Sequence, residues 1–324
     1  MPKILFLAEF APTNDVYPKP KEADKKFYAE TYHFKIYEVL KKNKYDFYST
    51  PDIEFLINNS KDIDLVWSVY NRIGFRNSEI FIQSLCEYLG VEYIGAAPNV
   101  RALVEDKSMS KQLAEHLGIE TANWVVASKK YPLSSQQPFS GPYFVKPQFG
   151  SASISINETS ICDNWKSVIE KANEYFKDDI DVIVEEFIDG HYYGVPIMNS
   201  FKGLPIVGVP HVQFSNKSGN VITYNQKRFI EPGMQRFASF DVNLNKMLTH
   251  YTKKYFLNMQ PCDYARIDFI VEKNTGIPYF LEVNVLMNLG FKSGFIESFL
   301  LNDKFNSYED IIIYILNLGL HRVL

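Results

Sequence analysis

Four polar residues near the C-terminus have types and a spacing that could do chemistry: Arg266, Asp268, Glu282 and Asn284. The stretch RIDFIVEKNTGIPYFLEVN predicts a β-hairpin, because apolar residues flank a short turn with a glycine where a positive φ is needed. If the strands pair symmetrically about Thr275, Asp268 lies opposite Glu282 and Arg266 opposite Asn284. Side chains alternate faces along a strand, so all four point the same way.

The apolar residues of the hairpin are expected on its other face, toward a core: Ile267, Phe269, Leu281 and Val283. Carboxylates that face each other across a strand pair repel. One explanation is a divalent cation, since Mg²⁺ takes one or two carboxylates and fills its shell with water and phosphate oxygens. The alternative is a solvated sheet face that tolerates the repulsion.

A strand, a lysine and a loop of small residues follow one another in FVKPQFGSASISI. Backbone N–H groups at Gly150, Ser151, Ala152 and Ser153 could approach phosphates closely, and Lys146 could supply positive charge. The stretch lacks the GxxxxGK[ST] pattern of a Walker loop. A turn of small residues with no ligand is the alternative.

Three further stretches allow a nucleotide-binding or a purely structural interpretation. VIVEEFIDG could hold adenine through Glu185, Phe187 and Ile188, or could simply be the end of a strand. EDKSMSKQL places Lys107 and Lys111 one helical turn apart, either as phosphate ligands or on a solvated face. YNQKRF sets Lys227 and Arg228 between aromatic residues, as part of a lid or as surface charge.

The composition limits the class of protein. The 324 residues are 46% hydrophobic and carry a net charge of -4, so a large core is expected and a nucleic-acid partner is not. Three scattered cysteines predict a reducing cytoplasm and no zinc site. The apolar stretch DIIIYILNLGL is far short of a membrane span, so no membrane partner is expected.

Strands and helices alternate up to about residue 99, which predicts a parallel α/β domain over residues 1–99. Helices and strands then predict an α+β unit over 100–188. A strand-rich segment with the hairpin and a helical tail occupies 189–324.

The order of these stretches resembles the ATP-grasp superfamily, and more closely the D-alanine–D-alanine ligase family, from about Gly90 to Gly294. GVEYIGAAPNVRALVEDKSMSK is similar to that family's GxPYTGS...ALxxDKxxxK segment, and RIDF...FLEVN is similar to GRID...LEAN. The resemblance implies an N-terminal α/β domain followed by two α+β subdomains that sandwich ATP.

The resemblance also implies roles for individual residues. ATP would be bound through its phosphates and its adenine by Lys107, Lys146, the loop Gly150–Ser155, Glu185, Phe187, Ile188 and Lys227. Two Mg²⁺ ions, with Mn²⁺ as the alternative, would be held by Asp268, Glu282 and Asn284. Arg266 would stabilise the charge that develops during reaction, and Ser293 would hold the carboxylate of the second substrate.

The chain departs from that family's pattern mainly around the substrates. Tyr192 stands where a glutamate usually holds the ribose, and Ser155 replaces a glycine of the phosphate loop. The family's GxxSxExxVS stretch is not recognisable, and YNRIGFRNSE replaces its HGxxGEDG stretch. We therefore expect substrates other than two D-alanines, with candidate pocket residues Glu30, Arg72, Arg76 and Glu79.

These observations predict an ATP-dependent carboxylate–amine ligase that works through an acyl phosphate on a small carboxylic acid and an amine or amino acid. A non-catalytic ATP-binding regulatory subunit and a small-molecule kinase on the same fold are the alternatives. The resemblance also implies a homodimer.

Overall fold

The computed structural model describes residues 1–18, 29–70, 78–150, 158–214 and 235–324. Its first sheet has the order β2-β1-β3-β4 and is parallel throughout. The strands are β1 (Ile4–Leu7), β2 (Phe47–Thr50), β3 (Leu65–Ser68) and β4 (Glu92–Tyr93), and the helices between them are α1 (Ala29–Lys42), α2 (Ile53–Asn59) and α3 (Phe81–Leu89). Ile4 and Phe6 pack into one apolar cluster, whereas Leu5 and Leu7 pack into another on the opposite face. A parallel sheet covered on both faces explains this apolar run.

Two helices connect the first sheet to the rest of the chain: α4 (Pro98–Glu105) and α5 (Lys107–His116). Asp106 separates them in an extended conformation, and its side chain accepts hydrogen bonds from the backbone N–H groups of Ser108 and Met109. This N-cap ends one helix and begins the next, and so sets where Lys107 points.

The second sheet is antiparallel, with the order β5-β8-β6-β7. Its strands are β5 (Trp124–Ala127), β6 (Tyr143–Pro147), β7 (Ile161–Cys162) and β8 (Val182–Glu186), and α6 (Trp165–Lys177) covers one face. β6 carries Lys146 and β8 carries Glu185, and their pairing brings these two residues onto one face of the sheet as diagonal neighbours, because Glu185 lies opposite Phe144 and Lys146 opposite Ile183.

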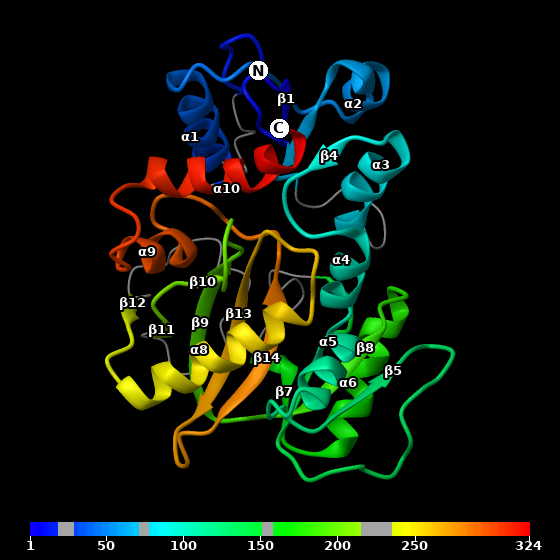
Figure 1. Cartoon of the computed structure of the whole chain (residues 1–324). Helices are drawn as coiled ribbons and strands as arrows, with labels where there is room; N and C mark the ends of the chain where they lie inside the picture. Colours follow the sequence, from blue (N-terminus) through cyan, green and yellow to red (C-terminus); the bar gives the residue numbers. More distant parts are fainter. Residues whose placement is uncertain (19–28, 71–77, 151–157, 215–234) are drawn as a thin grey trace.

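The third sheet has the order β12-β11-β9-β13-β14, and β10 pairs with β9. Its strands are β9 (Gly190–Met198), β10 (Ile206–Val207), β11 (His211–Phe214), β12 (Gln235–Ala238), β13 (Tyr264–Glu272) and β14 (Pro278–Asn284). Helix α8 (Val242–Leu257), yellow in Figure 1, crosses one face of this sheet. That face carries Ile267 and Phe269, which pack in one cluster with residues of α8, α4 and α5.

The hairpin confirms the predicted pairs, since Arg266 lies opposite Asn284 and Asp268 opposite Glu282. Gly276 in the turn has a φ of +70°. The prediction that Leu281 points into the core is wrong. The register shifts after Asp268, so Phe269 pairs with Phe280 and not with Leu281. This β-bulge moves Phe280 into the core, where it is 1% exposed.

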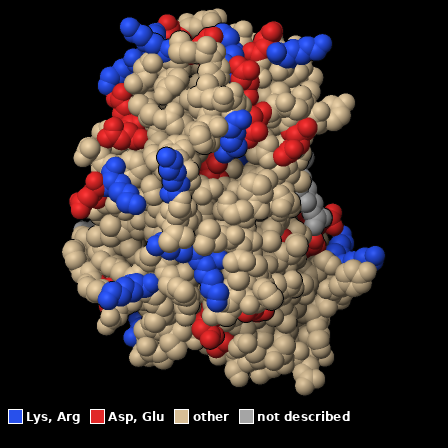
Figure 2. All heavy atoms as spheres, viewed as in Figure 1, with Lys and Arg blue, Asp and Glu red and all other residues tan. Residues whose placement is uncertain are grey.

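The chain ends with α9 (Gly294–Leu300) and α10 (Tyr308–Val323), and α10 contacts β3, β4 and α1 of the first unit. Figure 1 shows α10, in red, between the first sheet and the third. Charges of both signs are interleaved on the face drawn in Figure 2. Among the helices of the described ranges, none has the length and apolarity that crossing a membrane requires.

Candidate active site

The polar face of the hairpin is tied together by hydrogen bonds. Arg266 Nε and Nη2 each donate to one oxygen of Asp268 at 2.7 Å. Nη2 also donates to the hydroxyl of Tyr192 at 3.0 Å, and Asn284 Nδ2 donates to Asp268 Oδ2 at 2.8 Å. Asp268 is fully buried. Arg266, Asp268 and Asn284 therefore restrain one another, and Glu282 lies opposite Asp268 on the same face.

The Arg266 guanidinium keeps its charge in this setting. Its burial alone would lower the pKa, but the carboxylate of Asp268 outweighs that effect, and the pKa of Arg266 lies above its usual value. A bidentate contact between a guanidinium and a carboxylate also fixes orientation. Arg266 is thus held as a permanent, oriented positive charge beside Glu282.

Three lysines are buried next to this face, and two of them meet a single carboxylate. Lys146 Nζ lies 2.8 Å and Lys111 Nζ 3.2 Å from the two oxygens of Glu185. Lys107 Nζ donates instead to the carbonyl oxygen of Gly150 at 2.6 Å. None of these lysines is more than 7% exposed.

Lys111 and Lys146 share the one carboxylate of Glu185. Burial by itself raises the pKa of Glu185, but Lys111 and Lys146 outweigh it and hold that pKa below its usual value, so Glu185 is ionised. Burial lowers the pKa of Lys107 to about 8, although Glu282 opposes this shift. Buried cations in excess of their counter-charges are stabilised by an anion, and phosphate is the anion that such a lysine cluster suits.

The remaining predicted residues are placed as follows. Phe187 and Ile188 are half-buried directly after β8, and the Phe187 N–H donates to the carbonyl of Pro142. The Ser293 hydroxyl accepts from the N–H of Ile296 and caps α9. Ser151, Ala152, Ser153, Ser155, Lys227, Arg228, Arg72 and Arg76 lie outside the described residues, as does the side chain of Glu30.

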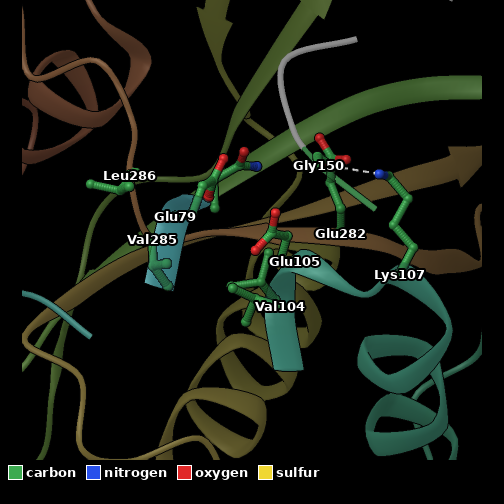
Figure 3. A pocket seen from close by; sticks show the side chains of 10 residues that line it. Glu79, Val104, Glu105, Lys107, Gly150, Glu282, Val285 and Leu286 are labelled. Carbon is green, nitrogen blue, oxygen red and sulfur yellow. Dashed lines mark hydrogen bonds between the residues drawn. The ribbon is translucent and has the colours of Figure 1, made fainter. Parts of the chain in front are cut away.

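A small cavity lies between the hairpin, α4 and the start of the loop at Gly150 (Figure 3). Its polar lining comes from Glu79, Glu105, Lys107, Glu282 and Asn284. Sequence reasoning proposed Glu79 but did not use Glu105, which directly precedes the Asp-Lys pair of VEDKSMSK. A carboxylate two positions before Lys107, a predicted phosphate ligand, is the signal that could have found it.

The hairpin residues fit a hard divalent cation by the chemistry of their donors. Glu282 and Asn284 line the cavity, and Asp268 lies beside them on the same face, so all three offer oxygen atoms. In the part of the chain that is described, no three His, Cys, Asp or Glu side chains converge on one point that could hold a metal ion. Two carboxylates and an amide suit an ion that takes its other ligands from water and phosphate.

Comparisons with known proteins agree with this geometry. Residues 107–317 match the family model described as D-ala D-ala ligase C-terminus. The chain is 28% identical to a D-alanine–D-alanine ligase of Clostridium perfringens over 291 residues, covering 86% of this chain and 89% of that protein. It is 28% identical to one of Clostridium beijerinckii over 238 residues, covering 72% and 74%.

A solved structure gives the same result for the fold. The D-alanine–D-alanine ligase of Bacillus anthracis, solved in complex with ATP, superposes with a TM-score of 0.74 at 20% identity, over 100% of this chain and 98% of that one. This confirms the predicted ATP-grasp architecture of one parallel α/β sheet and two antiparallel sheets with helices. The chain belongs to the D-alanine–D-alanine ligase family, and it is an ATP-dependent ligase.

Proposed function

We propose that this ligase joins a small carboxylic acid to an amine or amino acid, with ATP and Mg²⁺, and that its substrates differ from two D-alanines. The observation that carries the proposal is the cluster of buried cations at Lys107, Lys111 and Lys146, of which the last two share one carboxylate, beside the hairpin face with Arg266, Asp268 and Glu282. One side of this site suits phosphates, and the other would offer oxygen ligands to a cation.

The reaction has two steps. A carboxylate oxygen of the acid attacks the γ-phosphorus of ATP, which forms an acyl phosphate and releases ADP. The nitrogen of the amine then attacks the acyl carbon, phosphate leaves, the nitrogen loses a proton, and an amide is formed. The protein contributes position and charge stabilisation.

Lys107 and Lys146 would bind the phosphates, with the loop from Gly150 over them, including Ser151, Ala152 and Ser153. Lys227 would reach the γ-phosphate. Arg266 would stabilise negative charge on the acyl phosphate and the tetrahedral intermediate. Ser293, which caps α9 in this structure, would turn to the second substrate.

Two Mg²⁺ ions held by Asp268, Glu282 and Asn284, or Mn²⁺ in their place, would neutralise the phosphate charge. Glu282 and Asn284 border the cavity, whereas both oxygens of Asp268 already accept hydrogen bonds from Arg266. The side chain of Tyr192 is buried, and its hydroxyl accepts a hydrogen bond from Arg266. This contact favours a role for Tyr192 in orienting Arg266 over a role in binding the ribose. Adenine would lie against Phe187 and Ile188, near Glu185.

The difference in substrates rests on the first 99 residues, where the family's substrate motifs are replaced. We propose the boundaries 1–99, 100–188 and 189–324 for the three units, with the third unit returning α10 to the first sheet. A homodimer stays a prediction, which the mass of the protein in solution would check.

The test is to incubate the protein with Mg²⁺, ATP and pooled D- and L-amino acids and small acids, and to measure ADP, phosphate and new masses. A product with the mass of acid plus amine minus water supports the proposal and names the substrates. A phosphorylated acid without condensation would contradict it, and D-alanyl-D-alanine as the preferred product would refute the difference in substrates.

Replacing Glu282 tests the cation site. We expect Glu282→Gln to lower turnover by at least ~100-fold, because one carboxylate ligand and its charge are lost. The control is Glu174→Gln on α6, whose side chain is 62% exposed. Unchanged turnover in Glu282→Gln, with a fold equal to that of the control, would rule out Glu282 as a cation ligand.

A further inference from the structure

The row of residues that begins with Glu282 continues across the third sheet to a histidine. Asp268 of β13 lies opposite both Glu282 of β14 and Gly194 of β9, and Gly194 lies opposite His211 of β11. Residues that lie directly opposite each other in neighbouring strands point to the same face of a sheet. His211 therefore shares the face that carries the proposed cation ligands, with one glycine between it and Asp268.

The glycine in this row lets the imidazole approach Arg266. A Cβ atom at Gly194 would lie 2.7 Å from Nε2 and 2.8 Å from Cε1 of His211, and 3.2 Å from Cδ of Arg266. The imidazole and the carbon chain of Arg266 thus border the same small space above Gly194. Side chains that share such a space in a close-packed interior restrict each other's movement.

Ser298 of α9 fixes the orientation of the imidazole. A hydrogen bond joins Ser298 Oγ and His211 Nδ1 at 2.9 Å, and the two residues are only 1% and 4% exposed. The carbonyl oxygen of Ser298 also accepts the N–H of Val209, two residues before His211. Helix α9 is therefore attached to the start of β11 at two points, and one of them sets the plane of the ring.

Hydrogen bonds hold the far end of Arg266 but leave its carbon chain to be held by packing. The guanidinium donates to Asp268 and to the hydroxyl of Tyr192. The chain that leads to it has several rotatable bonds, which lose their freedom where neighbouring atoms fill the surrounding space. His211 lies on the β11 side of this chain and limits its movement in that direction.

We propose that His211, oriented by Ser298, is a positioning residue that keeps Arg266 directed at the charge that develops during the reaction. Stabilisation of that charge depends on donors that are already aimed at it before the reaction begins. The inference rests on the proposed function, because it concerns the role assigned there to Arg266. His211 acts through Arg266 and transfers no proton in this role.

The test uses variants that separate the body of the ring from its hydrogen bond. His211→Ala removes the group beside Arg266, whereas His211→Phe keeps a ring and loses the bond to Ser298. Ser298→Ala removes that bond from the other side, and both of these variants keep most of the packing if His211→Ala fails to fold. Val212→Ala is the matched control, because Val212 is the next residue of β11, is buried and points to the opposite face.

Turnover is measured as hydroxamate formed from hydroxylamine, Mg²⁺, ATP and the pooled D- and L-amino acids and small acids. We expect His211→Ala to lower the maximal rate ~10-fold and to leave the KM for ATP unchanged, as when an interaction of the transition state alone is lost. His211→Phe and Ser298→Ala should each lower the rate ~3-fold. Their double variant should lose no more than either single variant, because both remove the same hydrogen bond.

The position of Arg266 has a direct readout that needs no substrate. Its Nε–H donates to Asp268, and ¹⁵N NMR of the arginine Nε–H groups follows the exchange of this proton with solvent. The resonance is assigned by its loss in Arg266→Lys. We expect exchange at least ~10-fold faster in His211→Ala than in the wild-type protein, and the wild-type rate in Val212→Ala.

Three outcomes would overturn the inference. His211→Ala could keep the wild-type rate and the wild-type exchange, it could show the same changes as Val212→Ala, or it could raise the KM for ATP while the maximal rate stays constant. The second outcome would make His211 a structural residue of the sheet, and the third would place it in ATP binding. Failure of the proposed function is distinguishable: the wild-type protein would form no hydroxamate, while the exchange of the Arg266 Nε–H would still test the positioning.

Discussion

Glu185 lies between the ammonium groups of Lys111 and Lys146, and all three side chains are buried. A carboxylate in this position compensates charge within the fold, whatever it also contributes to adenine. Removing one partner from a buried ionic network leaves uncompensated charge, which costs far more than the loss of a surface pair.

We predict that Glu185→Gln lowers the free energy of unfolding by ~3 kcal/mol, because two buried lysines lose their shared counter-charge. Urea unfolding with and without ATP would measure this loss, and ATP should restore part of it. The exposed Glu174→Gln should change stability by less than ~0.5 kcal/mol. Wild-type stability in Glu185→Gln together with lost ATP affinity would show that Glu185 acts only on the nucleotide.

His33 in α1 is 2% exposed, and its Nδ1 accepts the N–H of Phe10 at 3.3 Å, between the rings of Phe10 and Tyr32. Burial lowers the pKa of His33 to about 3. Below about pH 6.5 the His33 imidazole is protonated in the unfolded chain but stays neutral in the folded chain until the pH is near 3. The free energy of unfolding therefore decreases as the pH is lowered from about 6.5 to about 3.

Between pH 7.5 and pH 5 we expect the wild-type protein to lose ~2 kcal/mol more stability than His33→Phe, from the linkage of ~1.4 kcal/mol per pH unit below the unfolded pKa. Urea unfolding at the two pH values measures the loss of stability in each protein. Protonation of the carboxylates contributes equally to both losses, so subtracting one loss from the other leaves the contribution of His33. Equal losses would mean that His33 is protonated in the folded state.

At the scale of elements, Gly194 on β9 allows side chains from neighbouring strands to approach. The register places it between His211 of β11 and Asp268 of β13. A Cβ atom at this position would lie 2.7 Å from His211 Nε2 and 3.2 Å from Arg266 Cδ. Glycine therefore leaves the space through which Arg266 reaches Tyr192.

We predict that Gly194→Ala lowers turnover roughly 10-fold, because displacing Arg266 weakens its stabilisation of the developing charge. Val195→Ala, on the opposite and buried face of the same strand, is the matched control. It should lower stability but keep turnover at low temperature. Full activity of Gly194→Ala in steady-state assays would show that the added methyl group does not displace Arg266.

At the scale of the whole molecule, α10 ties the last segment of the chain to the first sheet. Arg322 donates to both oxygens of Asp263 at 2.7 and 3.0 Å and to Glu92 Oε1 and the Tyr93 carbonyl at 2.6 Å. Asp263 is 4% exposed and also accepts the N–H of Gly95. One arginine thus connects α10, β4 and the segment before β13.

We predict that Arg322→Ala lowers the free energy of unfolding by ~1–3 kcal/mol, the usual cost of leaving a buried acceptor with fewer partners. Lys273→Ala removes an exposed ion pair with Asp189 and should change stability by less than ~1 kcal/mol. Chemical unfolding of both variants would compare them. Equal effects would imply that solvent replaces Arg322 at Asp263.

The sequence by itself determined the features that depend on local chemistry. Alternation of apolar and polar residues about a glycine turn predicted the pairing of Asp268 with Glu282, and the helical spacing of Lys107 and Lys111 agrees with α5, which begins after the cap at Asp106. Turn residues, caps and side-chain alternation act over a few residues, so they can be recognised without knowing what packs against them.

Only the tertiary structure decided which distant side chains meet. The bulge that buries Phe280 in place of Leu281 satisfies the packing of a sheet against α8. The binding of Glu185 by two lysines and the return of α10 to the first sheet each join segments far apart in the chain. Such contacts depend on burial and on the space left by neighbouring elements, which no local pattern encodes.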